Sequence, residues 1–335
     1  MDDLFWGQVL QVDISPRMSR LIRSLLACSL IPVCLAAFLG MAETPEVITL
    51  GNGSFQMQVT MPMTRCISEY GPRFDISAAI TSVKLDGNEF LINEGLIDEF
   101  NIAWIPPPGY SEAKPGETFL KIGVGEVIRE EEKNYEFWRK YKLRQPASTS
   151  FVRQEGGLAF TQSILLESGW GYEYRKSYAI HPESRTITVA YSLQNIGQHT
   201  IEASQYTHNW FALGGFSKET PPCVIPDFGF TEPPPAWLSL ANGRLTLARK
   251  PAPGDYFTAT RLADASKNRM QVVNLEKNQS VTVSGDFEVS RFSLSVNPSA
   301  LCPEIFIHIT LSPGQIKTWS RTYEFSNTET QPSRP

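Results

Sequence analysis

The segment FQMQVTM, residues 55–61, alternates strictly between apolar and polar side chains. A period of two residues is typical of a β-strand that buries one face. Turn-forming residues follow such segments, as in Asp86-Gly87-Asn88 and Ser312-Pro313-Gly314. Many strands at short spacing predict an all-β protein built as one large antiparallel sandwich. The same alternation recurs in TITVAYSL, RFSLSV, EIFIHITL and TWSRTYEF, at residues 186–193, 291–296, 304–311 and 318–325.

One segment, GEVIREEEKNYEFWRKYKL at residues 125–143, could instead be argued to form a helix. Its apolar positions follow neither the helical period nor the strand period for long. We therefore predict a charged loop between strands here, with the charged run at residues 130–133 facing solvent.

Length and composition set broad limits on the class of protein. The chain has 335 residues, of which 41% are hydrophobic and 19% are charged, so it can bury a large core. We predict a single domain over residues 45–326, followed by a disordered tail at residues 327–335. The formal net charge is -5 and no lysine and arginine cluster is visible, which argues against a nucleic-acid partner.

The amino-terminal region departs from this average composition. Residues 18–42 begin with arginines and continue into an apolar run that ends in Gly40-Met41-Ala42, as secretory signal peptides do. We expect cleavage near Ala42 and a periplasmic or secreted protein without a stable membrane span. A membrane anchor is the alternative, because the run approaches spanning length, but Pro32 interrupts it. Residues 1–17 are expected to be a non-native extension ahead of a start at Met18.

Cysteine usage argues against a disulfide framework. Two of the five cysteines lie within the expected signal peptide. The other three, Cys66, Cys223 and Cys302, lack the C-x-x-C spacing of a zinc site and are too sparse for a disulfide scaffold. We predict at most one disulfide, no metal site and no organic cofactor.

A histidine among aromatic rings is the first candidate for chemistry. In QYTHNWF, residues 205–211, a strand would place Tyr206, His208 and Trp210 on one face. Aromatic rings beside hydrogen-bonding tips suit a sugar, because its C–H face stacks on rings while its hydroxyls need donors and acceptors. The alternative for His208 is a hydrogen-bonded histidine of the core.

Two further segments combine aromatic and polar side chains on one strand face, which predicts sugar binding, with plain solvent exposure as the alternative. They are GWGYEYRKSY, residues 169–178, with Trp170, Tyr172, Tyr174 and Lys176, and CPEIFIHIT, residues 302–310, with Glu304, Phe306 and His308.

Polar candidates also lie nearer the amino terminus. Arg73 and Asp75 share one face of an extended segment, either as a local ion pair or as ligands for substrate hydroxyls. Glu99, in the acidic stretch NEGLIDEF at residues 93–100, could add an acceptor, although acidic residues in loops mostly face solvent.

The order of three motifs resembles the aldose 1-epimerase-like, or galactose mutarotase-like, family of β-supersandwich proteins over most of residues 46–326. YGPRFDISAAITSVKLDGNEFL at residues 70–91 is similar to the family's early arginine segment, and QYTHNWFAL at residues 205–213 to its histidine strand. ITLSPGQIKTWSRTYEF at residues 309–325 resembles its closing hairpin and final aromatic strand. The resemblance implies a galactose mutarotase-like antiparallel β-supersandwich.

The resemblance also implies roles for individual residues. Arg73 would hold a sugar hydroxyl, His208 would give a proton to the ring oxygen, and Glu304 would act as the base. Asp227 is the candidate for the family's hydroxyl-binding aspartate. The sequence departs from the family around His208, where it reads Tyr-Thr-His-Asn-Trp-Phe, and it has no second histidine on a strand between Arg73 and His208.

Three functions remain open from the sequence. The first is an isomerase that uses acid/base chemistry at the anomeric centre of a sugar or uronate, with His208 and Glu304 on either side of the sugar ring. The alternative is a carbohydrate-binding protein of the cell envelope without turnover. The third is a structural envelope protein that binds no sugar. In the first two, the partner is a carbohydrate.

Overall fold

Two large antiparallel sheets dominate the computed structural model, which describes residues 46–102, 104–212 and 220–327. The five segments predicted from alternation all form strands, and the predicted all-β sandwich is confirmed. The expected extension at residues 1–17, the expected signal peptide at residues 18–42 and residues 328–335 of the expected tail lie outside the described residues.

The first sheet combines strands from the beginning, the middle and the end of the described chain. Its central strands pair in the order β5, β13, β23, so segments about a hundred residues apart in sequence become neighbours. In spatial order the sheet contains β1 (Glu46–Gly51), β2 (Phe55–Met61), β3 (Ala79–Leu85), β5 (Leu91–Phe100), β13 (Ile201–Phe211), β23 (Ala300–Leu311), β22 (Arg291–Asn297) and β18 (Tyr256–Ala259), with β4 (Asn88–Glu89) paired to β3.

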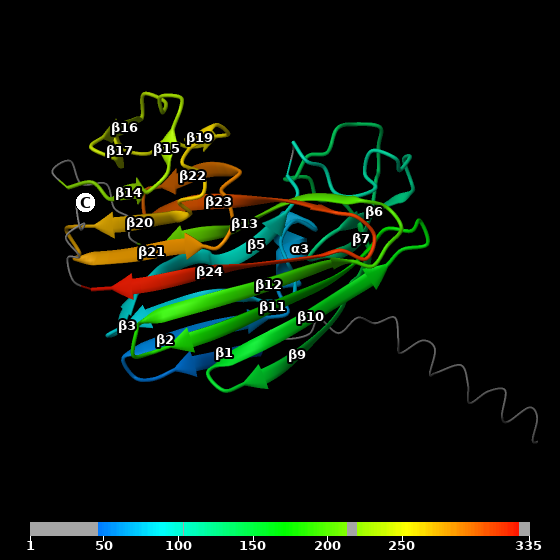
Figure 1. Ribbon diagram of the computed structural model, residues 1–335, viewed down its shortest axis with the longest axis horizontal. Coiled ribbons are helices and arrows are strands. Elements are labelled where there is room, and N and C mark those ends of the chain that lie inside the picture. Colours follow the sequence, from blue (N-terminus) through cyan, green and yellow to red (C-terminus); the bar gives the residue numbers. More distant parts are fainter. Residues whose placement is uncertain (1–45, 103, 213–219, 328–335) are drawn as a thin grey trace, which may run out of the picture. The chain divides into compact units, whose positions relative to one another are not determined.

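The second sheet includes the long strands that lie side by side as β24, β12, β11 and β10 in Figure 1. In spatial order it contains β16 (Leu238–Ala241), β17 (Arg244–Leu247), β14 (Cys223–Pro226), β20 (Arg269–Asn274), β21 (Gln279–Gly285), β24 (Ile316–Ser326), β12 (Thr186–Asn195), β11 (Gly171–His181), β10 (Gly157–Leu165) and β9 (Ser148–Gln154). Smaller sheets are formed by β6 (Thr118–Lys121), β7 (Gly125–Ile128) and β8 (Leu143–Pro146), and by β15 (Gly229–Phe230) and β19 (Leu262–Ala263).

The core lies between the two large sheets because each contributes its apolar face. In β2 the buried residues Phe55, Met57 and Val59 alternate with the half-buried glutamines. In β12 the buried residues Ile187 and Val189 follow the same period. These side chains belong to one continuous hydrophobic cluster. Its burial is the main apolar contribution to stability.

The short helix α3 (Arg65–Tyr70) is absent from the sequence-based expectation. Six residues are too few for a helical period to be recognised. Residues 125–128 of the segment considered for a helix form strand β7, and residues 129–142 form no regular helix or strand. The predicted charged loop is therefore confirmed for the larger part of the segment.

A charged network crosses the interior of the sandwich. The ammonium of Lys176 on β11 is fully buried, and it donates to Asp75 at 2.5 Å, to Asp98 on β5 at 3.2 Å and to the carbonyl of Ala78 at 2.8 Å. An unpaired charge in this position would carry a large desolvation cost. The two carboxylates therefore fix Lys176 and connect the two sheets.

Neutral side chains complete this network around Asp98. Its carboxylate accepts hydrogen bonds from Tyr191 on β12 at 3.0 Å, and from Gln205 and Thr207 on β13 at 2.8 and 2.7 Å. Burial raises the pKa of Asp75, although Lys176 opposes that shift. The network thus joins β11 and β12 of one sheet to β5 and β13 of the other.

The prediction that the 169–178 face binds sugar is wrong. Tyr172, Tyr174 and Lys176 are each at most 1% exposed, because this face of β11 points into the core and not to solvent. Asp75 is likewise 1% exposed and is occupied by Lys176. The predicted substrate-binding roles of Asp75, Tyr174 and Lys176 are therefore excluded by burial.

Two other properties of the described residues bear on the sequence-based expectations. Cys66, Cys223 and Cys302 are all free thiols. The described part of the chain has no helix with the length and apolar character needed to cross a membrane.

Replacing Lys176 should strongly destabilise the fold. Lys176→Ala leaves Asp75 and Asp98 buried without their cation, so the free energy of unfolding should fall by about 3–5 kcal/mol. Urea unfolding monitored by circular dichroism measures this change. Lys84→Ala is the matched control, because Lys84 is exposed on β3. A loss no larger than that of the control would contradict the proposed importance of the network.

Candidate functional site

The three central strands of the first sheet place a second group of polar side chains on its other face. Gln205 and Thr207 point from β13 into the sandwich, and alternation turns Tyr206 and His208 the opposite way. Asp98 and Glu99 are divided between the two faces of β5 in the same manner. The face opposite to the buried network thus carries the candidate site.

His208 is 6% exposed and lies at the centre of this group. Its Nε2 atom is 3.0 Å from the hydroxyl of Tyr206 and 3.3 Å from Oε2 of Glu99. Its Nδ1 atom is 3.5 Å from Oε1 of Glu304 on β23. The two ring nitrogens therefore face two different carboxylates.

Glu99 organises the Nε2 side of the ring. Its Oε2 atom is 2.9 Å from Nε of Arg73, and it also accepts a short hydrogen bond from the Tyr206 hydroxyl. Burial would raise the pKa of Glu99, but the Arg73 guanidinium and the hydrogen bond to His208 lower that pKa to about 2. Glu99 is therefore a fully buried carboxylate whose lowered pKa favours the ionised form, and it orients Arg73, Tyr206 and His208.

Glu304 lies on the Nδ1 side in a different electrostatic environment. It is 3% exposed, and its burial raises the pKa of the carboxyl even though His208 and Arg73 oppose the shift. The thiol of Cys302, two residues earlier on β23, donates to Oε1 of Glu304 at 3.5 Å. Burial also raises the pKa of this thiol well above its ordinary value.

The contact between His208 and Glu304 corrects one expectation. A sugar ring does not fit between two atoms that are 3.5 Å apart, so the two groups cannot lie on either side of the ring. They can instead share one proton and approach a substrate from the same side. The ring oxygen and the hydroxyl oxygen of an anomeric centre are bonded to one carbon, and an adjacent acid and base can therefore reach both.

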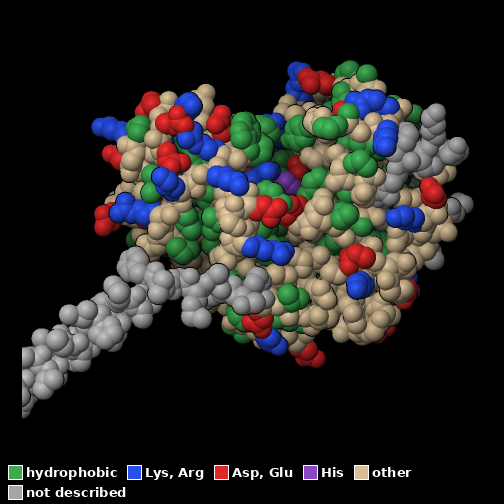
Figure 2. All heavy atoms as spheres, turned by 180° about the vertical axis from the view of Figure 1, so that it is seen from behind, with side chains coloured by type: hydrophobic (Ala, Val, Ile, Leu, Met, Phe, Trp, Pro, Cys, Tyr) green, Lys and Arg blue, Asp and Glu red, His purple; other side chains and the backbone are tan. Residues whose placement is uncertain are grey.

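Aromatic side chains surround the polar cluster. The ring of Phe306 stacks on Tyr206 with centroids 4.2 Å apart, and Trp104 lies 6.2 Å from Phe306. Trp104 is 39% exposed, and the guanidinium of Arg291 lies 3.5 Å above its ring. Figure 2 shows a hollow on one face in which a histidine and acidic side chains are visible between hydrophobic ones. Partly exposed rings beside polar groups are typical of sugar sites.

Five of the predicted site residues lie together: Arg73, Glu99, Tyr206, His208 and Glu304. Trp210 is half-buried at the end of the same strand. Two predicted residues lie apart from the cluster, because Asp227 is engaged by Arg269 at 3.4 Å and His308 is exposed beside Glu202 at 3.4 Å. Their predicted substrate-binding roles are not supported by this placement.

The sequence-based reasoning missed Cys302 and Trp104 as site residues. Cys302 could have been found, because a strand places it on the same face as Glu304. Trp104 follows β5 in an irregular segment, and no periodic signal predicts where its ring lies.

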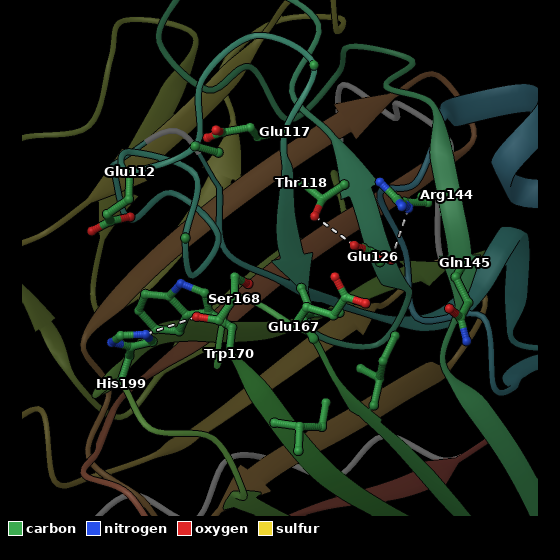
Figure 3. A pocket seen from close by; sticks show the side chains of 16 residues that line it. Glu112, Glu117, Thr118, Glu126, Arg144, Gln145, Glu167, Ser168, Trp170 and His199 are labelled. Carbon is green, nitrogen blue, oxygen red and sulfur yellow. Dashed lines mark hydrogen bonds and ion pairs between the residues drawn. The ribbon is translucent and has the colours of Figure 1, made fainter.

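A separate pocket of about 940 Å³ is lined by other residues. Figure 3 shows Glu112, Glu117, Glu126 and Glu167 around it, with Arg144 bonded to Glu126 and His199 bonded to the carbonyl of Ser168. None of the residues around His208 lines it. The His208 cluster is the stronger candidate for chemistry, because its titratable groups are buried and in mutual contact, and because the pKa values of Glu99 and Glu304 are shifted in opposite directions.

Comparison with solved structures identifies the architecture. A galactose mutarotase-like protein from Lactobacillus casei is 14% identical, and the alignment covers 84% of this chain and 100% of that chain with a TM-score of 0.54. The galactose mutarotase-like fold is therefore established. A provisionally named aldose 1-epimerase from Escherichia coli K12 is 13% identical over 84% of this chain and 99% of that chain, with a TM-score of 0.52.

A third galactose mutarotase-like structure, from Clostridium acetobutylicum, is 12% identical over 85% of this chain and 98% of that chain, with a TM-score of 0.51. No protein-family model and no curated protein matches the sequence. The galactose mutarotase-like fold predicted from three motifs is thus confirmed by structure, at identities too low for sequence comparison to detect.

The raised pKa of Glu304 predicts how the free energy of unfolding depends on pH. A carboxyl group with a raised pKa in the folded state contributes stability below its unfolded value of about 4.5 and loses that contribution as pH rises. Glu304→Gln cannot ionise, so its stability relative to the wild type should increase as the pH rises above about 4.5.

Thermal unfolding at several pH values measures this difference. Glu324→Gln is the control, because Glu324 is exposed on β24. A Glu304→Gln variant that loses stability relative to the wild type as pH rises would contradict the assigned environment.

Proposed function

We propose that this protein is an aldose 1-epimerase-like enzyme that interconverts the anomers of a sugar or uronate by acid/base chemistry. The observation that carries the proposal is the direct approach of His208 Nδ1 to Glu304 Oε1 at 3.5 Å, near the partly exposed ring of Trp104. The similar structures named above support a role in carbohydrate chemistry, and the substrate and turnover are part of the proposal.

The reaction needs two proton transfers at one carbon. One group protonates the ring oxygen while another removes the proton of the anomeric hydroxyl, and the bond from the anomeric carbon to the ring oxygen breaks to give an aldehyde. Rotation of the aldehyde and the reverse proton transfers close the ring as the other anomer. In each step the enzyme gives one proton and takes one, so the number of protons that it carries does not change. A pair of groups that shares one proton can perform both transfers.

The environment of each group matches one of these tasks. Glu304 has a raised pKa because of burial, so its carboxylate is a stronger base than an exposed one. Glu99 keeps a negative charge 3.3 Å from Nε2 of His208 and stabilises the ring when it carries a proton. His208 is therefore assigned as the acid and Glu304 as the base.

Arg73 and the aromatic rings provide the expected binding contacts. The Arg73 side chain is 18% exposed, and its guanidinium is held between Glu99 and the rings of Phe74 and Phe137, each 4.6 Å away. Its remaining donors can hold a sugar hydroxyl. The partly exposed ring of Trp104 can stack on the C–H face of the sugar, and the buried ring of Phe306 packs against Trp104.

Substitution of either reacting group should slow turnover while binding persists. His208→Ala and Glu304→Gln should each reduce the rate of anomer interconversion by roughly 10²- to 10⁴-fold, because each group donates or accepts a proton in the transition state. Exchange NMR against a panel of monosaccharides and uronic acids measures the rate, and calorimetry measures binding.

His308→Ala is the matched control, because His308 is an exposed histidine on β23 outside the cluster. Full activity in His208→Ala would contradict the proposal. Sugar binding by the wild type without interconversion of any tested anomer would instead support the non-catalytic carbohydrate-binding protein.

A further inference from the structure

Three different metal-ligating side chains converge in the site. His208, Cys302 and Glu304 are buried and each offers one ligand atom, with all three atoms within 4.8 Å of one another. Sγ of Cys302 is 3.9 Å from Nδ1 of His208 and 3.5 Å from Oε1 of Glu304. The third side of this triangle, from Nδ1 to Oε1, is 3.5 Å.

Two of these distances, both 3.5 Å, match the edges of a metal coordination tetrahedron, and the third, from Sγ to Nδ1 at 3.9 Å, would have to shorten slightly. A tetrahedral zinc ion with bonds of about 2.0–2.3 Å holds its ligand atoms about 3.3 to 3.6 Å apart. We propose that His208, Cys302 and Glu304 bind a divalent transition-metal ion of the zinc class, with a fourth position left for water or a sugar oxygen. Three protein ligands with one open position for water or substrate also occur in known zinc sites, where four protein ligands would close the site.

The groups around the triangle support metal binding. A histidine that ligates metal generally donates its other ring N–H to a carboxylate, and Nε2 of His208 lies 3.3 Å from the buried carboxylate of Glu99. The backbone N–H of Asn209 donates to Sγ of Cys302 at 3.2 Å, which is a suitable contact for a ligating thiolate. Nε2 of His208 and Sγ of Cys302 therefore have the hydrogen-bond partners that a metal site needs.

The ligands are also held on rigid structure. His208 lies on β13, and Cys302 and Glu304 lie two residues apart on the adjacent strand β23. The side chain of Asn209 donates to the carbonyl of Pro303 at 2.6 Å, which fixes the backbone between the two ligands. Little rearrangement is needed before an ion binds.

The charges balance when the ion is bound. The thiolate of Cys302 and the carboxylate of Glu304 together neutralise a divalent cation, and the thiol proton is released to the buffer. Arg73 carries a nearby positive charge that would repel a metal cation, but it is paired with Glu99 on the Nε2 side of the ring.

A metal ion bound here would affect the proposed reaction, because it would use the same two side chains. A bound ion occupies the lone pairs of Nδ1 and Oε1 that the proposed proton transfers require. The metal-bound form should therefore be blocked in anomer interconversion, and removal of the ion should restore the rate. The metal would act as a reversible inhibitor of the same site.

The test uses the full chain, freed of metal by a chelator and then titrated with Co²⁺ and Zn²⁺. One Co²⁺ per chain should bind and produce the charge-transfer absorption of a cobalt–thiolate bond. Cys302→Ser should abolish this absorption and reduce Zn²⁺ affinity at least ~10-fold, and Glu99→Gln should reduce the affinity about 10- to 100-fold. Cys66→Ser and Cys223→Ser are the matched controls and should bind as the wild type does.

Glu304→Gln keeps the thiol and guards against a Cys302 variant that fails to fold, and near-ultraviolet circular dichroism checks each variant. Zn²⁺ affinity unchanged in Cys302→Ser or in Glu304→Gln, or Co²⁺ binding without thiolate absorption, would overturn the inference. The rate of the metal-free protein separates the two proposals. Metal binding with an inactive metal-free protein refutes the proposed function alone, and an active protein that binds no Zn²⁺ refutes the metal site alone.

Discussion

The buried ammonium of Lys176 constrains the rest of the structure. The ammonium cannot remain charged in the core without Asp75 and Asp98. Asp98 lies on β5, and Asp75 lies in the segment between α3 and β3. Each partner is close in sequence to a site residue: Asp75 follows Arg73 by two positions, and Asp98 precedes Glu99. The network that fixes Asp75 and Asp98 inside the sandwich therefore also fixes Arg73 and Glu99 on the opposite face of the first sheet.

Strand alternation then gives the site two unlike halves around one histidine. On the Nε2 side, Glu99 is kept ionised by Arg73, and its pKa falls to about 2. On the Nδ1 side, burial raises the pKa of Glu304. Two carboxylates with opposite shifts around one imidazole can hold a single mobile proton, and the same Nδ1 side can hold a metal ion through Cys302. The two proposals thus rest on one geometry.

Much of the fold could be predicted from local pattern, and the site only in part. The alternation in residues 55–61 and 304–311 identified strands, because period two is a property of the backbone. Alternation cannot tell which of two faces meets the second sheet, and for this reason Tyr174 and Lys176 were expected to face a sugar although they lie in the core. The same kind of face in residues 205–211 did lie outside the sandwich core, with Tyr206 and His208 beside Glu99.

The contact between His208 and Glu304 depends on β13 and β23 becoming neighbours, which no local pattern specifies. The cysteines were compared only with one another for zinc spacing, and the triangle of one cysteine, one histidine and one glutamate was missed because His208 lies 94 residues before Cys302. Asp227 was expected from the family resemblance alone, and the structure engages it in a surface ion pair.

A double-mutant cycle on the rate of anomer interconversion tests the central claim that His208 and Glu304 act as one coupled pair. The rates of His208→Ala, Glu304→Gln and the double variant are compared in the metal-free protein. The coupled pair predicts that the double variant is about as slow as the slower single variant, because either change already breaks the shared proton pair. Losses that multiply in the double variant would show that the two residues act independently and would contradict this account.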